Sequence, residues 1–256
     1  MANRGKDEGN LNEINRVKYL NRNVHNEKLS EYVNEFGQVY FVKVSTKQYS
    51  TLASKKVYTR ADSFAIKTND TRMNSVLKEN DFLLDENLLK EHKIDFTPIP
   101  FSGISMKLED SNYQILKMTP NSFEKLFGNR ILGAAASIFV KKEEELCHNK
   151  NVIEGWGCTM TKFLEYFNIT EEELFNSLEK CKEIRDCAEK EIISRIKTDK
   201  ELQQKIFNGT GLYEEPYTAH WFMEGENLSK LTTLPFKLTT GSGRHKGNYT
   251  LVLKKE

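Results

Sequence analysis

The apolar positions near the start of the chain recur with the period of an α-helix. Asn10 precedes them and is expected to begin this helix, and a second short helix is predicted over 27–35, ended by Gly37. The apolar face of the first helix consists of Leu11, Ile14, Val17 and Leu20.

A longer helical pattern runs from Thr170 to Phe207 in the second half of the chain. Thr170 and Glu173 have the spacing of a capping box, which opens a helix, and one break is expected near Thr198. The residues of its apolar stripe are Leu174, Leu178, Cys181, Ile184, Ala188, Ile192 and Ile196.

Short β-rich runs lie between the helical patterns and predict a sheet. Strands that follow a helix indicate the α/β class, with a mixed central β-sheet flanked by helices and a more helical C-terminal part ending in a β-hairpin. We expect a core of residues 1–145 and a helical and hairpin region of 146–256, packed as one compact unit. The expected strands are 39–44, 63–67, 104–108, 113–118, 236–238 and 249–253, with further helices over 81–92 and 121–127.

Composition narrows the function without deciding it. The chain has 38 basic and 37 acidic residues, a net charge of +1, which neither provides a basic coat nor excludes a local basic cleft. No apolar run approaches the roughly 18 residues of a membrane span, and the first residues lack the apolar core of a signal peptide. We therefore expect a cytoplasmic protein that binds no membrane, with its 4 cysteines reduced.

The clearest chemical pattern lies in two of the predicted strands. Asp62 stands immediately before the strand 63–67, and Lys107 follows Ser105 by two positions in the strand 104–108. Because side chains alternate along a strand, Ser105 and Lys107 share one face. If the two strands are neighbours, Asp62 faces Lys107.

Such a pair suits hydrolysis of a phosphodiester bond. That reaction uses a divalent cation, an activated water and a positive group near the developing negative charge. The carboxylate of Asp62 is the hard oxygen ligand that Mg²⁺ prefers, and Lys107 supplies the positive group.

The order of these residues resembles the PD-(D/E)xK nuclease superfamily, in particular its type II restriction endonucleases. The resemblance rests on three segments between about residues 5 and 140: Gly9-Asn10-Leu11-Asn12-Glu13, Arg60-Ala61-Asp62 and Gly103-Ile104-Ser105-Met106-Lys107. It implies a restriction-endonuclease-like fold and a bacterial enzyme that cuts double-stranded DNA at specific sequences with Mg²⁺. Asp62 would ligate the metal and Lys107 would be catalytic. A symmetric target would favour a homodimer.

Two positions depart from the pattern of that superfamily. Ala61 stands where a proline usually precedes the aspartate, and Ser105 stands where an acid usually precedes the lysine by two residues. A serine hydroxyl is a weaker metal ligand than a carboxylate, so we expect the second acid elsewhere. The candidates are Glu13 on the first helix, then Glu31 and Glu35.

Each site residue also has an ordinary structural explanation, which the sequence leaves open. Asp62 fits the turn before a strand, and Lys107 fits an edge strand, where lysines block aggregation. Glu13 lies three residues after Asn10 and completes a capping box there. Ser105 fits an ordinary strand position.

Further candidates would contact DNA. The glycine-rich loop between the last two predicted strands carries clustered cations, which suit phosphate or guanine contacts, although a solvated hairpin turn has the same composition. Trp156 and His220 are interpreted as core or satisfied residues rather than as DNA contacts. The candidates are Gln114, for a water or the scissile phosphate, Lys55 and Arg60, for the scissile strand, and Ser242, Arg244 and Lys246 in the loop.

The sequence thus predicts a Mg²⁺-dependent, sequence-specific endonuclease of a restriction system. The alternative is a non-catalytic DNA-binding or interaction protein on a nuclease-like scaffold, favoured by the serine at position 105.

Overall fold

The computed structural model describes residues 4–44, 59–108 and 113–256. These residues belong to two compact units. The first consists of Met1–Ser111 and Phe207–Thr233, and the second of Asn112–Ile206 and Leu234–Glu256.

The first unit is built on a mixed sheet with the strand order β1-β2-β4-β6-β7, with β3 paired to β2. Strands β1, β2 and β4 are antiparallel, and β6 runs parallel to β4. The elements are α1 (Arg4–Arg22), η1 (Glu27–Leu29), α2 (Ser30–Phe36), β1 (Tyr40–Lys43), β2 (Ser63–Lys67), α4 (Met73–Glu79), α5 (Glu86–Glu91), β3 (Thr97–Pro98), β4 (Ile104–Lys107), β6 (Trp221–Glu224) and β7 (Asn227–Lys230).

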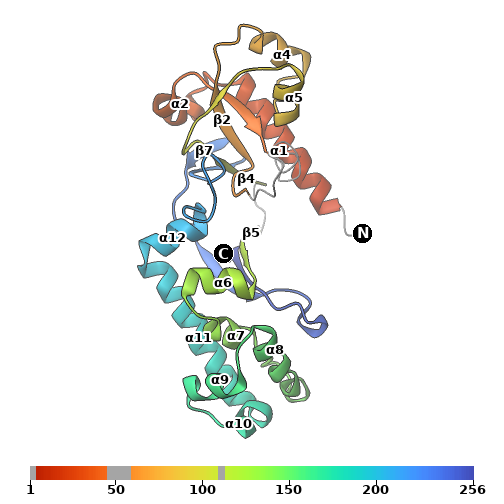
Figure 1. Ribbon diagram of the computed structural model, residues 1–256, viewed down its shortest axis with the longest axis vertical. Coiled ribbons are helices and arrows are strands. Elements are labelled where there is room, and N and C mark those ends of the chain that lie inside the picture. Colours follow the sequence, from red (N-terminus) through yellow and green to blue (C-terminus); the bar gives the residue numbers. More distant parts are fainter. Residues whose placement is uncertain (1–3, 45–58, 109–112) are drawn as a thin grey trace. The chain divides into compact units, whose positions relative to one another are not determined.

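Alternating strand residues bury both faces of this sheet. Phe41 and Ala65 face one hydrophobic cluster together with Val17 and Leu20 of α1. Their chain neighbours Val42, Phe64 and Ile66 face a second cluster, which includes residues of α4 and α5. Figure 1 shows α1 running alongside the strands of this sheet. The mixed α/β sheet flanked by helices that the sequence predicted is confirmed.

The first helix begins earlier than the sequence predicted. α1 starts at Arg4, so Asn10 lies inside the helix and does not cap it. Residues 4–9 are polar and lack the apolar period, which explains why the prediction began too late. The proposed capping box of Asn10 and Glu13 is therefore wrong, and the Glu13 carboxylate is not committed to the backbone there.

The second unit combines helices with a sheet of order β5-β9-β8. The capping box of Thr170 and Glu173 is confirmed, as is the break near Thr198. A second break at Ser177 was not predicted. The elements are β5 (Gln114–Met118), α6 (Pro120–Phe127), α7 (Ile131–Ser137), η2 (Glu143–His148), α8 (Asn149–Gly155), α9 (Met160–Phe167), α10 (Glu171–Asn176), α11 (Leu178–Thr198), α12 (Lys200–Phe207), β8 (Phe236–Thr240), η3 (Arg244–Lys246) and β9 (Leu251–Lys255).

The two units do not follow the expected division at residue 145. Strands β6 and β7 were not predicted, yet they complete the sheet of the first unit. The first unit is therefore discontinuous in sequence, because its last two strands come after most of the second unit. Within the described residues, no helix is long and apolar enough to span a membrane.

Candidate active site

Asp62 is held in place by the strands on both sides of it. Its backbone N–H donates to the carbonyl oxygen of Ile104 at 2.8 Å, and its own carbonyl oxygen accepts from the N–H of Val44 at 3.0 Å. The residue stands just before β2, where the regular pairing of β2 with β4 stops at Ser63 and Ile104. Its side chain therefore lies beside β4.

The carboxylate of Asp62 gathers donors from β4 on one oxygen. Oδ2 accepts a hydrogen bond from the backbone N–H of Met106 at 2.7 Å. The Ser105 hydroxyl and the Lys107 ammonium each lie 3.4 Å from the same oxygen. In the described part of the chain the other oxygen, Oδ1, has no hydrogen-bond partner, so it is available to a ligand.

Lys107 does not lie on an edge strand. Its strand β4 is between β2 and β6 in the sheet, which rules out the aggregation-blocking explanation. The Lys107 and Asp62 side chains are 26% and 23% exposed, respectively, so solvent reaches a pair that is otherwise enclosed. The expected facing of Asp62 and Lys107 is confirmed.

Glu13 approaches the same site from α1. Its carboxylate pairs with the ammonium of Lys43 on β1, with Oε2 and Nζ 3.0 Å apart. Partial burial raises the pKa of the Glu13 carboxyl, and the negative charge of Asp62 raises it further, while Lys43 and Lys107 act in the opposite direction. Glu13 is therefore close enough to Asp62 and Lys107 to share their electrostatic field.

The two other acids considered from sequence lie elsewhere in the first unit. Glu35 pairs with Lys230 of β7 at 2.6 Å, and the charge of Glu31 acts on the same lysine. β7 is the edge of the sheet opposite to β1, so neither acid is near Asp62. Of the three candidates, the structure brings Glu13 to the site.

Glu224 is an acid at this site that the sequence analysis missed. It lies on β6 directly opposite Lys107 in the parallel register, as Phe222 lies opposite Ser105. Residues paired in this way share a face of the sheet. Glu224 on β6 and Asp62, just before β2, therefore approach Lys107 from its two neighbouring strands. Glu224 could have been found only by predicting the strand Trp221–Glu224, which the sequence analysis did not do.

These residues present hard oxygen donors of the kind that Mg²⁺ prefers. Within the described residues, no group of three or more His, Cys, Asp or Glu side chains is arranged to hold a metal ion. Asp62 with one further carboxylate fits a magnesium ion whose remaining ligands are waters and substrate oxygens, the usual arrangement for this cation. Ser105 is 6% exposed and supports Asp62 rather than replacing the missing acid.

The structure bears differently on the three contact residues predicted at positions 55, 60 and 114. Lys55 lies outside the described residues. Arg60 is partly buried and donates to the carbonyl oxygen of Phe207 at 3.2 Å, and this burial lowers its pKa. Gln114 begins β5 of the second unit, opposite Lys254, so its role at the site stays a prediction.

The predicted DNA-binding loop belongs to the second unit. Ser242 and Lys246 are exposed in it. Arg244 instead donates to the carbonyl oxygens of Ser137 and Ile138 at 2.7 and 3.0 Å, and its guanidinium lies 4.2 Å from the centre of the Phe139 ring. Arg244 therefore holds its loop in place. The sequence analysis, which predicted a contact between Arg244 and a guanine, did not predict this structural role.

The ordinary explanations of Trp156 and His220 are confirmed. Trp156 is fully buried and packs edge-on against Phe123, so it is a core residue. His220 lies 2.9 Å from the carboxylate of Glu215, which satisfies its ring nitrogen.

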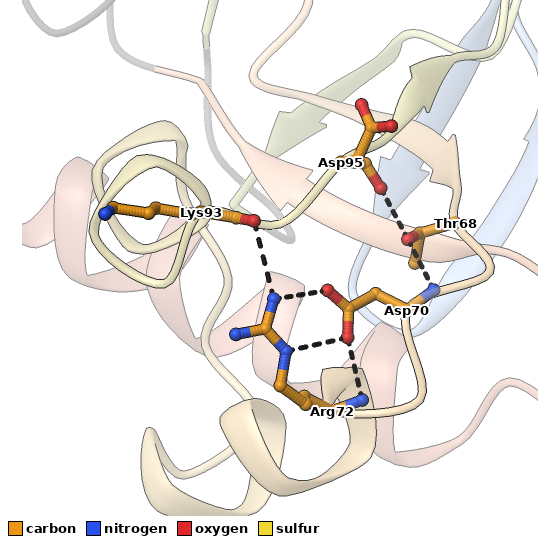
Figure 2. Close-up of polar contacts among 5 residues, drawn as sticks. All are labelled: Thr68, Asp70, Arg72, Lys93 and Asp95. Atoms are coloured by element: carbon orange, nitrogen blue, oxygen red, sulfur yellow. Dashed lines mark hydrogen bonds and ion pairs between the residues drawn. The ribbon is translucent and has the colours of Figure 1, made fainter.

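A second polar region of the first unit is a hollow of about 350 Å³ lined by Lys67–Asp70 and Asp95–Thr97. Figure 2 shows that its polar groups bind one another. The Asp70 carboxylate accepts two hydrogen bonds from the Arg72 guanidinium, and the Thr68 hydroxyl donates to the carbonyl oxygen of Asp95 at 2.6 Å. Neither Asp62 nor Lys107 is among the residues that line the hollow, so the hollow is not the candidate site.

Comparisons of this chain with protein-family models, with curated proteins and with solved structures find no match.

Proposed function

We propose that this chain is a Mg²⁺-dependent endonuclease that hydrolyses double-stranded DNA, as a sequence-specific enzyme of a bacterial restriction system. One observation carries the proposal: Asp62 and Lys107 meet at 3.4 Å beside the end of an interior strand, with Glu13 in their electrostatic field. The resemblance to type II restriction endonucleases was based on these same three residues.

In this proposal the protein side chains divide the work. Asp62 and Glu13 would hold the cation through the carboxylate oxygens that accept no hydrogen bond in the described structure. When bound, the cation would lower the pKa of a water and offset charge on the leaving oxygen. Lys107 would orient the attacking water and stabilise the charge that develops on the phosphate.

The finer fold assignment is part of the same proposal. A helix packed on antiparallel β1, β2 and β4, with β6 added in parallel, supports a restriction-endonuclease-like core. We also propose a homodimer in the bacterial cytoplasm, since two-fold proteins suit two-fold DNA targets.

Incubation of the purified chain with plasmid DNA, with Mg²⁺ or with EDTA, tests this function. Discrete fragments with Mg²⁺ and intact plasmid with EDTA are expected. A panel of unmethylated DNAs with varied sequences guards against a plasmid that lacks the target. Uncut DNA across the whole panel, with Mg²⁺ and with Mn²⁺, would refute the proposal.

The second candidate is a non-catalytic DNA-binding or interaction protein. Two observations favour it: Ser105 occupies the position of the usual acid, and no triad of metal-ligating side chains is found in the described residues. Binding of the same DNA panel without cutting, measured by gel shift, would support this candidate.

A further inference from the structure

Lys43 is a buried lysine on β1, at a position where the fold does not require a charged side chain. Its side chain is 9% exposed, and it follows Phe41 and Val42 on a strand that packs on both faces. Phe41, on the same face of β1, belongs to the apolar cluster beneath α1. An apolar side chain would suit this position, because removing an ammonium from water is costly unless it is paired.

The partner that compensates Lys43 is Glu13. The two charged groups are 3.0 Å apart, and the pair occupies Glu13 Oε2. Buried ion pairs are often no more stabilising than apolar replacements, so their presence beside a candidate active site points to a role other than stability.

The negative charges of Asp62 and Glu13 are already compensated by lysines in the free protein. Lys43 contacts Glu13, Lys107 contacts Asp62, and the charge of Asp62 also acts on Arg60. Glu13 and Asp62 thus each have a cationic partner in the free protein. A divalent cation that binds these carboxylates meets the positive charge of both lysines, which weakens its binding unless one lysine is displaced or an anionic phosphate enters with it.

We propose that Lys43 is an internal counter-ion of Glu13 that competes with the divalent cation for this carboxylate and so limits the cation affinity of the free protein. The inference rests on the proposed function in one respect, since it takes Glu13 as a cation ligand. Lys107 also contacts a carboxylate, but it is part of the proposed reaction. Lys43 is separate from that reaction and acts on the cation through Glu13.

If Lys43 competes with the cation, its removal has the opposite effect on cation affinity from the removal of a residue that supports cation binding. If Lys43 merely oriented Glu13 for the cation, its removal would weaken cation binding, as the loss of a residue that positions a metal ligand does. If Lys43 competes, its removal frees Glu13 and takes one positive charge from the site. We then expect about tenfold tighter binding, because the variant removes a unit positive charge that lies a few ångströms from the bound cation.

The test measures Mg²⁺ and Mn²⁺ binding to the full chain without DNA, by isothermal titration calorimetry. The variants are Lys43→Met, of similar length and without charge, and Lys43→Gln, which keeps a hydrogen-bond donor for Glu13. Lys67→Met is the matched control, because Lys67 is an exposed lysine on the neighbouring strand β2. Circular dichroism and thermal unfolding show which variants are folded, and Lys43→Gln decides if Lys43→Met does not fold.

Tighter binding in the Lys43 variants, with Lys67→Met like the wild type, would support the inference. The gain should disappear when Glu13→Gln is added to either Lys43 variant, since the competition is for this carboxylate. Unchanged or weaker cation binding in a folded Lys43 variant would overturn it.

The outcome is separable from that of the proposed function. Tighter cation binding without any cutting of DNA would leave the competition intact and refute the nuclease. Mg²⁺-dependent cutting that Asp62→Asn abolishes, with Lys43 variants that bind the cation as the wild type does, would refute the competition alone.

Discussion

The ammonium of Lys107 lies 3.4 Å from the carboxylate of Asp62, although 45 positions separate the two residues in sequence. The contact is produced by the backbone, because the N–H of Met106 fixes the same carboxylate oxygen from the strand that carries Lys107. A bound phosphate would therefore meet a positive group whose position is set by the sheet.

Replacing Lys107 by Met should reduce DNA cleavage by at least about 100-fold while leaving DNA binding nearly unchanged, because one positioned charge-stabilising group has an effect of this size. Asp62→Asn should abolish cleavage. Initial rates of plasmid nicking give the activity, and gel shifts give the binding. Lys67→Met, on the same sheet, is the control and should cut as the wild type does. Full activity in both site variants would disprove the assignment.

Glu224→Gln should lower the cleavage rate without unfolding the protein, because Glu224 shares a face with Lys107 and flanks it from β6. The expected loss is about tenfold, as for a residue that supports a catalytic group. It is smaller than for Asp62, whose carboxylate contacts both the Met106 N–H and Lys107. The matched control is Glu35→Gln, which removes an acid from the far edge of the sheet. Equal rates for Glu224→Gln and the control would exclude Glu224 from the site.

Gly133→Ala should destabilise the second unit. A Cβ at this position would lie 2.3 Å from an atom of the buried Trp156 ring, and such overpacking costs about 1–3 kcal/mol. Gly9→Ala is the matched opposite case in α1, where a Cβ meets nothing within 4 Å. It should stabilise the helix by about 0.5–1 kcal/mol. Urea unfolding monitored by circular dichroism measures both, and equal effects would contradict the packing around Gly133.

The capping box of α10 should make stability depend on pH. Hydrogen bonds from Thr170 hold the pKa of the Glu173 carboxyl below its usual value. A group with a lowered pKa in the folded state contributes stability above its unfolded pKa, and this contribution is lost as the pH falls through the folded pKa.

Glu173→Gln should therefore lower stability at neutral pH and change it little in acid, where the wild-type carboxyl is protonated. Urea unfolding of both proteins at pH 7 and below about pH 4 makes the comparison. Glu172→Gln removes an acid from the same helical turn and corrects for the helix dipole. An equal loss at both pH values would contradict the hydrogen-bonded carboxylate.

Cys181 should resist thiol reagents in the native protein. Burial raises the pKa of its thiol to about 11, and the side chain is fully enclosed. Cys147 and Cys187 are exposed and should react at pH 8. Mass spectrometry after brief alkylation distinguishes the sites, and Cys181 should react only in denaturant. Rapid native labelling of Cys181 would contradict the packing of α11.

Sequence periodicity was sufficient to predict much of the fold and the shared face of Ser105 and Lys107 in the candidate site. The period-two argument placed Ser105 and Lys107 on one face, and the structure agrees, because alternation is a local property of a strand. β6 was missed because Trp221, Phe222 and Met223 are all buried, so the strand shows no alternation of apolar and polar residues.

The pairing of Glu13 with Lys43 could not have been predicted in this way. It depends on how α1 packs on β1, which no local pattern encodes. From sequence, Glu13 was interpreted equally well as part of a helix cap. Glu224 could not be predicted for a related reason. Its place beside Lys107 depends on β6, a strand far along the chain that pairs with β4.

The late return of β6 has a consequence for biosynthesis. A parallel neighbour of β4 requires a crossover, and here the chain forms most of the second unit before β6 follows. While the ribosome is still making that unit, β4 is an open sheet edge with Asp62 and Lys107 already synthesised beside it. A product truncated at residue 206 would keep both residues but expose that edge, and would be prone to aggregate. The nascent chain therefore completes the sheet around its candidate site only after most of the second unit has been synthesised.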